Sequence, residues 1–253
     1  MEHSGRHALV TGGGTGIGLA IATALANAGA EVTITGRRAD VLKAAAAATP
    51  RLHPVAVDVT DETALRDAIA RAAEERGPVA ICVANAGIAE GGRFRDVTMT
   101  DWRRTMSTNL DGAFVTFQVA LATLGKADWG RMIAVSSIAG VRGLAGAVPY
   151  TASKHGLIGL IRALSEEHMG RAVTFNALCP GYVDTDIVTR NAAAIAARRG
   201  IPEAAAAADM ARGNRHRTLL QVDEVAGAAM WLCSDAARSV NGQTIQVAGG
   251  QVA

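Results

Sequence analysis

A tyrosine and a lysine four residues apart, Tyr150 and Lys154, are the pair in this sequence best suited to acid–base chemistry. The chain has only two tyrosines and three lysines, so a chance pairing at this spacing is uncommon. On a helix, residues i and i+4 share one face and point to a common place. A phenol has a pKa near 10, and a nearby ammonium stabilises its anion and lowers that pKa. The spacing therefore predicts a general acid/base that works near neutral pH.

Two further polar residues are candidates for the same site. Ser137 ends a predicted strand, where its hydroxyl can donate a hydrogen bond to a substrate carbonyl while charge develops on oxygen. Asn109 lies in a long predicted helix and can connect to Lys154 through a water molecule. Simpler interpretations stay open: Ser137 as a strand-end turn, and Asn109 as a packing amide inside its helix.

A glycine-rich turn at residues 11–18 is typical of a dinucleotide site, because it follows a predicted strand and leads directly into a helix. Glycine permits positive φ and close approach of the backbone to a pyrophosphate, and the helix N-terminus offers free N–H groups. A tight turn without a ligand is the alternative. The predicted cofactor-binding residues of this turn are Gly12, Thr15, Gly16, Ile17 and Gly18.

The end of the second predicted strand distinguishes the two nicotinamide cofactors. An acid there would bind the ribose 2′-hydroxyl and repel a 2′-phosphate, but the sequence has Arg37 and Arg38 instead. Guanidinium groups neutralise and hold a phosphate. We therefore expect NADP(H) to be preferred, with NAD(H) possible, unless the two arginines only begin a solvated helix.

Two later strand ends complete the expected cofactor site. Asp58, followed by Val59, ends the third predicted strand and is placed to reach the adenine amino group. Asn85, Ala86 and Gly87 end the fourth and can hold backbone close to the adenosine ribose. Both segments have strand-terminating turns as their alternative interpretation.

Composition excludes several other classes. The 253 residues are 49% hydrophobic and 19% charged, with a formal charge of +2, which gives no reason to expect a nucleic-acid partner. The three cysteines are scattered, so a reducing cytoplasm is expected and no zinc cluster is indicated. The six histidines have no ligand spacing, so no catalytic metal is expected. The longest uncharged stretch is too rich in glycine to be a membrane span, and no signal peptide is evident.

Short β-branched runs alternate with longer alanine-rich segments of helical period, the pattern of βαβ units with a parallel sheet. Strands are predicted at residues 7–12, 31–36, 52–58, 79–85, 131–137, 172–179 and 243–247, and helices at 16–28, 39–48, 62–75, 99–124, 149–168 and 222–234. Near-continuous apolar runs indicate strands buried on both faces. We expect an α/β fold: a Rossmann-type, doubly wound, seven-stranded parallel sheet flanked by helices.

No linker divides these elements, so residues 1–253 are predicted to form a single dinucleotide-binding catalytic domain. One segment, about 186–219, departs from the alternation and contains two short predicted helices, 187–199 and 202–212. Insertions of this length often cover a site, so we expect a small helical lid. A fixed surface helix pair is the alternative.

At these motifs the sequence resembles the short-chain dehydrogenase/reductase family over nearly its whole length. The resemblance implies that Tyr150 is the general acid/base, Lys154 its activator and a ribose ligand, and Ser137 the residue that orients the carbonyl. It also implies that Asn109 belongs to a proton relay. One departure is Ala84, where the family usually has a second asparagine. In the loop after the sixth strand, the resemblance implies that Pro180, Gly181, Val183 and Thr185 bind the cofactor, with Thr185 and the backbone of Val183 holding the nicotinamide carboxamide.

The expected reaction interconverts a ketone and a secondary alcohol by hydride transfer. The sequence is similar to the branch that acts on 3-oxoacyl thioesters, polyketide ketones and 3-hydroxybutyrate. Hydroxybutyrate enzymes hold a carboxylate with polar residues where this chain has Ala89 and Ala139, and a buried carboxylate without partners is costly. A 3-oxoacyl thioester or a bulky apolar ketone is therefore favoured. The alternative is an NAD-dependent secondary-alcohol or 3-hydroxyacid dehydrogenase.

Three arginines near the expected site mouth, Arg93, Arg95 and Arg142, could meet the phosphates of coenzyme A or be ordinary solvated residues. An alternative of another class is a catalytically silent dinucleotide sensor on the same fold. The resemblance also implies a homotetramer, formed by pairing of the long fourth and fifth helices. The apolar residues of these two helices that could form the contact between subunits are Phe114, Phe117, Leu121, Leu157, Leu160 and Leu164.

Overall fold

The computed structural model describes residues 2–126 and 129–251, so the outermost residues of the predicted domain, 1 and 252–253, lie outside the described part. Its centre is a seven-stranded sheet in the order β3-β2-β1-β4-β5-β6-β7, with every neighbouring pair parallel. The predicted sheet is confirmed. The strands are β1 His7–Thr11, β2 Glu31–Gly36, β3 Leu52–Ala56, β4 Val79–Ala84, β5 Gly130–Val135, β6 Val173–Pro180 and β7 Thr244–Val247.

The strand order reverses between β1 and β4, because β2 and β3 extend the sheet in one direction and β5 to β7 in the other. At such a point the crossover helices diverge to opposite faces and leave a crevice at the carboxyl ends of the strands. The glycine-rich turn follows β1, and the segment beginning at Asn85 follows β4. The topology therefore brings the two predicted cofactor segments to one crevice.

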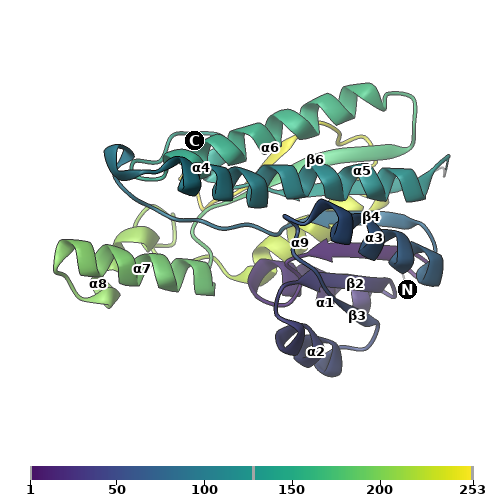
Figure 1. The fold of residues 1–253 in the computed structure, drawn as a ribbon, viewed down its shortest axis with the longest axis horizontal. Coiled ribbons are helices and arrows are strands. Elements are labelled where there is room, and N and C mark those ends of the chain that lie inside the picture. Colours follow the sequence, from purple (N-terminus) through teal and green to yellow (C-terminus); the bar gives the residue numbers. More distant parts are fainter. Residues whose placement is uncertain (1, 127–128, 252–253) are drawn as a thin grey trace.

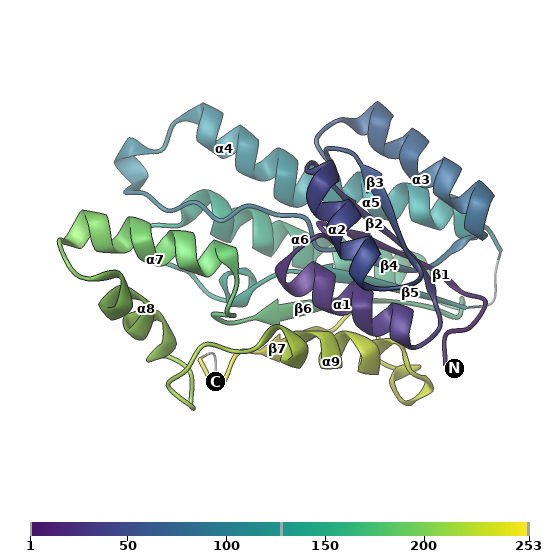
Figure 2. The same ribbon diagram turned by 90° about the horizontal axis from the view of Figure 1, so that it is seen from below.

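Helices cover both faces of the sheet (Figures 1 and 2). One face packs against α1, α2 and α9 through the cluster that includes Ile34 and Leu25, and the other against α3, α5 and α6 through the cluster that includes Phe117 and Phe175. The helices are α1 Gly16–Asn27, α2 Ala39–Ala48, α3 Glu62–Arg76, α4 Met99–Met106, α5 Gly112–Leu124, α6 Val148–Glu167, α7 Asp186–Arg199, α8 Glu203–Ala211 and α9 Val222–Cys233.

The prediction of one continuous α-helix over residues 99–124 was wrong at one place. Residues Ser107–Asp111 form a π-helical turn between α4 and α5, with Asn109 buried inside it. The amide of Asn109 bonds to the backbone of Ile88, an interaction outside the helix that periodicity cannot reveal. Single π-turns inside α-helices often occur at functional sites.

The predicted helix pair after β6 is α7 and α8, which extends beyond the carboxyl end of the sheet (Figures 1 and 2). The two helices pack on each other through a small cluster of their own that includes Val188, Ala196 and Met210. Gly200 ends α7 with φ +66°, the left-handed conformation that glycine adopts at helix ends. The pair is therefore attached to the sheet mainly through the segment after β6.

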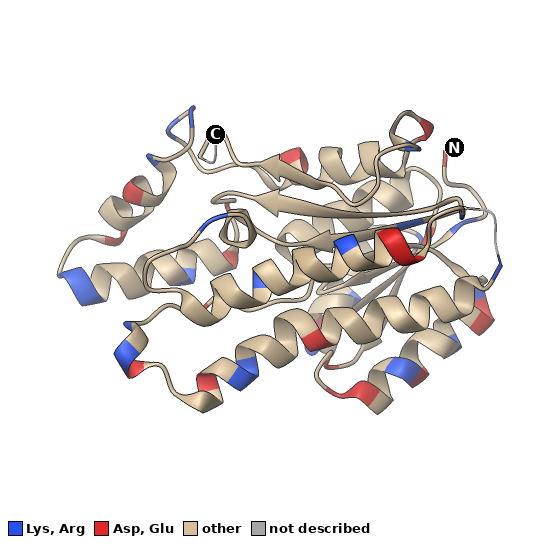
Figure 3. Ribbon diagram, turned by 90° about the horizontal axis from the view of Figure 1, so that it is seen from above, with Lys and Arg blue, Asp and Glu red and all other residues tan. Residues whose placement is uncertain are grey.

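Charged residues of both signs are mixed along the helices in Figure 3. Within residues 2–126 and 129–251, no helix has both the length and the apolar composition needed to cross a lipid bilayer.

The apolar helix faces that were expected to pair between subunits are partly buried in the core of their own subunit. Phe117 and Leu157 are each 1% exposed, because both pack into the core under α5 and α6. That part of the prediction was wrong, since helical spacing alone does not distinguish a core face from an outer one. Phe114 is 48% exposed and stays a candidate contact of the predicted homotetramer.

A buried histidine at the amino end of the sheet makes stability depend on pH. His7 donates from Nδ1 to the carbonyl of Gly77 at 2.8 Å, and its Nε2 accepts from the hydroxyl of Thr33 at 2.8 Å. Burial lowers the pKa of His7 below its usual 6.5. The native state therefore resists protonation of His7 in a pH range where the unfolded chain accepts it.

We expect the free energy of unfolding to be unaffected by His7 above pH 6.5 and to fall as the pH drops below 6.5, since only the unfolded state then gains the proton. Urea unfolding at pH 7.5, 6.5 and 5.5 measures this slope. His7→Asn should cost about 1 kcal/mol at pH 7.5 through a lost hydrogen bond and should flatten the slope. His216→Asn, at an exposed position, is the control and should leave it unchanged. An equal slope in His7→Asn and the parent protein would contradict the assignment.

Candidate active site

The glycine-rich turn between β1 and α1 is unsuited to side chains at two of its positions. Gly16 has φ +55°, the left-handed region that glycine tolerates best. A Cβ added to Gly18 would lie 2.3 Å from the carbonyl oxygen of Gly12 and 2.4 Å from Nδ2 of Asn85. Thr15 caps α1 without a side-chain cap bond, so the first N–H groups of the helix face the crevice. This geometry fits a pyrophosphate at the helix N-terminus.

A set of hydrogen bonds joins the ends of β1 and β4 beneath this turn. The hydroxyl of Thr11 accepts from the backbone N–H groups of Asn85 at 3.0 Å and Ala86 at 3.1 Å. The side-chain amide of Asn85 donates to the carbonyls of Thr11 at 2.9 Å and Gly12 at 3.2 Å. Thr11 was not among the predicted site residues, although its position at the start of the glycine motif was a signal. The pairing fixes the width of the crevice.

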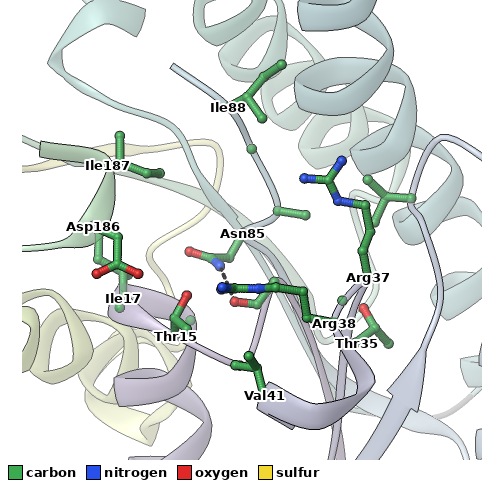
Figure 4. A pocket seen from close by; sticks show the side chains of 18 of the residues that line it. Thr15, Ile17, Thr35, Arg37, Arg38, Val41, Asn85, Ile88, Asp186 and Ile187 are labelled. Atoms are coloured by element: carbon green, nitrogen blue, oxygen red, sulfur yellow. Dashed lines mark hydrogen bonds between the residues drawn. The ribbon is translucent and has the colours of Figure 1, made fainter. Parts of the chain in front are cut away.

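A groove of about 280 Å³ runs from this turn along the ends of β2 and β3 (Figure 4). Arg37 and Arg38 both line it, are exposed, and form no ion pair with any residue that the structure describes. Figure 4 shows Arg38 extended toward Asn85 and Arg37 directed away from it. These two guanidinium groups, unpaired within the described residues, are available for a phosphate group.

The other predicted cofactor residues line the same groove, among them Asp58, Val59 and Gly87. One carboxylate oxygen of Asp58 accepts from the N–H and the hydroxyl of Thr60 at 3.0 and 2.9 Å, which holds the carboxylate in place. Arg190 of α7 also lines the groove, a residue that no sequence motif indicated. The lining therefore fits an adenine dinucleotide, with acceptor and cationic groups at one end and free helix N–H groups in the middle.

Tyr150, Ser137 and Lys154 meet at the carboxyl ends of β5 and β6. Ser137 accepts a hydrogen bond from the N–H of Ala139 at 3.1 Å, and its hydroxyl lies beside the phenol of Tyr150, whose pKa it lowers. Lys154 is 4% exposed, and its ammonium donates to the carbonyl of Val135 at 2.7 Å. The same ammonium lies 5.7 Å from the centre of the Tyr150 ring. The structure thus brings the three predicted side chains together, with the ammonium beside the ring and not bonded to the phenol oxygen.

The charge states in this cluster differ from the sequence prediction. Burial raises the pKa of Tyr150, and the bond to Ser137 offsets this only in part. Burial lowers the pKa of Lys154 to about 8. The predicted lowering of the Tyr150 pKa by Lys154 was therefore wrong for this arrangement, because the ammonium bonds to a backbone carbonyl and not to the phenol oxygen. A neutral phenol at physiological pH can act as a proton donor.

Asn109 holds the π-turn against two other segments. Its Oδ1 accepts from the N–H of Ile88 at 2.8 Å, and its Nδ2 donates to the carbonyl of Ile88 at 2.9 Å and the hydroxyl of Ser153 at 3.1 Å. Ser153 in turn donates to the carbonyl of Tyr150 at 2.8 Å. The side chain of Asn109 therefore makes no direct bond to Lys154, although a Cβ on Gly87 would lie 3.3 Å from Oδ1 of Asn109 and 3.5 Å from Nζ of Lys154.

Two serines outside the predicted set position the catalytic helix. Ser153 links Asn109 to the first turn of α6, and Ser136 donates to the backbone carbonyl of Lys154 at 3.1 Å. A Cβ on Gly140 would lie 2.5 Å from Oγ of Ser136 and 2.9 Å from the carbonyl of Lys154, so α6 approaches the end of β5 closely there. Both serines are buried hydroxyls next to predicted site residues, which is the signal that could have identified them.

A second cavity, of about 350 Å³, continues from the cofactor groove and is lined by Tyr150 and Lys154. Six residues line both spaces, including Ile17, Ile88 and Thr185, so the two are continuous. The predicted nicotinamide residues that line the second cavity are Pro180, Gly181, Val183 and Thr185. A backbone bridge to Leu220 uses the groups of Tyr182 and Asp184 on either side of Val183 and fixes this segment.

The three arginines expected near the site mouth, Arg93, Arg95 and Arg142, do not line this cavity, which favours the alternative that they are ordinary solvated residues. Arg142 instead donates to the carbonyl of Gln251 at 3.1 Å, and Arg95 faces Asp96 at 3.7 Å. Ala89 lines the cavity as expected, whereas Ala139 is completely buried and does not. Most of the wall is apolar.

A model of the short chain dehydrogenase family matches residues 6–196. The chain is 35% identical over 246 residues to an acetoacetyl-CoA reductase of Rhizobium meliloti (strain 1021), which covers 97% of this chain and 98% of the relative. It is 35% identical over 255 residues to a D-beta-hydroxybutyrate dehydrogenase of Cupriavidus necator, covering 99% of both. The crystal structure of a single-substitution variant of the actinorhodin polyketide ketoreductase with NADPH superposes with a TM-score of 0.95 at 29% identity, covering 99% of this chain and 98% of that one.

Proposed function

Because this chain belongs to the short-chain dehydrogenase family, we propose that it is an NADP(H)-dependent ketoreductase acting on a 3-oxoacyl thioester or a bulky apolar ketone. The observation that carries the proposal is the grouping of Tyr150 and Lys154 in the wall of the second cavity, with Ser137 beside the phenol, where this cavity meets the cofactor groove. A carbonyl in that cavity would lie between these groups and the groove.

Each residue of the cluster has a separate chemical role in this proposal. The hydroxyl of Ser137, oriented by the N–H of Ala139, donates a hydrogen bond to the carbonyl oxygen and stabilises the charge that develops there. The neutral phenol of Tyr150 gives its proton to that oxygen, and in the reverse direction its anion accepts the proton. The ammonium of Lys154, which bonds to the carbonyl of Val135 and lies 5.7 Å from the centre of the Tyr150 ring, would hold the ribose of the cofactor beside the phenol. When bound, the nicotinamide would supply the hydride to the carbonyl carbon.

The preference for NADP(H) rests on Arg37 and Arg38, which lie without ion-pair partners among the described residues at the end of the groove. A 2′-phosphate carries about two negative charges, which two guanidinium groups can neutralise and hold by forked hydrogen bonds. The absence of an acid at the end of β2 removes the group that would favour NAD(H).

The choice of substrate rests on the cavity and on the relatives. The relative from Rhizobium meliloti is named an acetoacetyl-CoA reductase, and the cavity wall here is largely apolar, with Ala89 after the β4 segment. A thioester or an apolar ketone fits such a wall without leaving a carboxylate unpaired. An NAD-dependent 3-hydroxyacid dehydrogenase is the second candidate, favoured by the relative from Cupriavidus necator named D-beta-hydroxybutyrate dehydrogenase.

A substrate panel tests the proposed function. Purified protein is mixed with NADPH or NADH and with acetoacetyl-CoA, an apolar cyclic ketone or acetoacetate, and the loss of reduced-nicotinamide absorbance is followed. The proposal expects turnover of the thioester or the apolar ketone, faster with NADPH. Turnover of acetoacetate alone with NADH would support the second candidate. Binding of the dinucleotide without turnover of any ketone would favour a silent sensor.

A further inference from the structure

The helix α7 presents one face to the second cavity, and the composition of this face changes along its length. Its lining residues recur at helical spacing: Ile187, Val188, Asn191, Ala194, Ile195 and Arg198. The first of these also lines the cofactor groove, and the last is a cation at the opposite end of the helix. A mainly apolar wall therefore ends in a guanidinium group.

The guanidinium of Arg198 makes one hydrogen bond within the described structure, and its other N–H groups are available to a ligand. Its Nη1 donates to the carbonyl of Gly91 at 3.0 Å, which uses one of its five N–H donors. Among the residues that the structure describes, no carboxylate forms an ion pair with it. The neighbouring Arg199, by contrast, pairs with Asp209 at 3.2 Å.

The other charged groups that line the cavity are already paired or bonded. The carboxylate of Glu90 pairs with Arg104, and the ammonium of Lys154 bonds to the carbonyl of Val135. Within the described chain, Arg198 is thus the cation of this cavity that remains free to meet an anion on a ligand.

The position of Arg198 sets the length of a ligand that reaches it. Arg198 lies eleven positions after Ile187, which is about 16 Å along a helix axis. Because helical side chains lean toward the N-terminus, the guanidinium lies nearer to the reacting end, on the order of 10 Å from it. A small oxo acid such as acetoacetate, whose carboxylate is two bonds from the ketone, cannot span this distance.

We propose that Arg198 is a specificity-determining residue that binds an anionic group, a carboxylate or a phosphate, about 10 Å from the ketone of the substrate. A guanidinium binds either group through two parallel hydrogen bonds, and its bond to Gly91 holds it in place beforehand. The apolar residues between Ile187 and Arg198 accommodate the chain that joins the two ends. This inference rests on the proposed ketone chemistry of the same cavity.

Two matched pairs of compounds test the inference and distinguish its two anions. The first pair is 8-oxononanoate and its methyl ester, and the second is 7-oxooctyl phosphate and 8-hydroxyoctan-2-one, which has the same carbon chain without the phosphate. Binding is measured by calorimetry to protein saturated with oxidised dinucleotide, so that no ketone is reduced, and kcat and KM are measured with the reduced cofactor. The variants are Arg198→Gln and, as the matched control, Arg199→Gln.

In one of the pairs, the charged compound is expected to bind the parent protein about tenfold more tightly than the neutral one, the low end for a charge-assisted hydrogen bond at an exposed site. Arg198→Gln should bring that ratio close to one by raising KM with little change in kcat, and Arg199→Gln should keep it. Equal binding within both pairs, or a ratio that survives Arg198→Gln, would overturn the inference. Failure of the neutral compounds and of every other ketone to oxidise the cofactor would instead contradict the proposed function.

Discussion

Tyr150→Phe is expected to lower kcat for ketone reduction by about 10²-fold to 10⁴-fold, the range for losing a positioned general acid. The substitution removes one oxygen and leaves the ring, which packs with the ammonium of Lys154 5.7 Å from its centre. Cofactor binding and thermal stability should change little, so the loss should appear in kcat at saturating cofactor. Steady-state kinetics with the best ketone of the panel measures it.

Tyr182→Phe is the matched control, because the chain has only these two tyrosines and both line the second cavity. Tyr182 comes from the segment after β6 and has no bond to Ser137 in the described structure. We expect its loss to lower kcat by less than about tenfold, since it supplies no proton. Near-native turnover in Tyr150→Phe, or an equal loss in both variants, would refute the role proposed for Tyr150.

Removing the two charges beside the groove should change which cofactor binds. The double substitution Arg37→Gln and Arg38→Gln is expected to raise the Kd for NADPH by about 100-fold, on the order of tenfold for each charge-assisted hydrogen bond lost at an exposed position. The Kd for NADH should stay within about threefold, because NADH lacks the 2′-phosphate that these side chains would meet. Fluorescence titration of both dinucleotides measures the two constants.

Lys43→Gln removes an exposed charge from the same helix, α2, at a position that does not line the groove. It serves as the control for long-range electrostatic effects and should leave both constants unchanged. Equal affinities of the parent protein for NADPH and NADH would contradict the proposed preference. If the double variant lost affinity for NADH as much as for NADPH, the arginines would support the shape of the groove and would not bind the 2′-phosphate.

The sheet and the Tyr150–Lys154 pair could be predicted because each depends on local order in the sequence. Buried parallel strands are continuous apolar runs, and the i,i+4 spacing places two side chains on one face of any helix. The bounds of β2 and α2 were predicted to the residue for the same reason. The glycine turn was recognisable because its strand and helix context is part of the motif.

Features that depend on contacts between distant segments were not predictable in this way. The bonds from Thr11 to the β4 segment, the π-turn at Asn109 and the bond from Lys154 to Val135 all join residues far apart in sequence. The last of these determines where the ammonium lies and therefore why it does not lower the pKa of Tyr150. Whether a helix face is buried in its own subunit, as for Phe117, also depends on neighbours that periodicity does not reveal.

Two hydrogen bonds of the side-chain amide of Asn109 anchor the backbone of Ile88 and so separate the fixed part of the site from the part that can vary. Both backbone groups of Ile88 are bonded to Asn109, which is linked through Ser153 to the turn of α6 that carries Tyr150. The chain before this anchor therefore keeps its place relative to the reacting groups, whatever follows it. Substitutions at residues 89–91 and along α7 can change the wall of the second cavity without moving the cluster around Tyr150. Under the proposed ketone chemistry, one set of reacting groups can thus serve different substrates through changes confined to these segments.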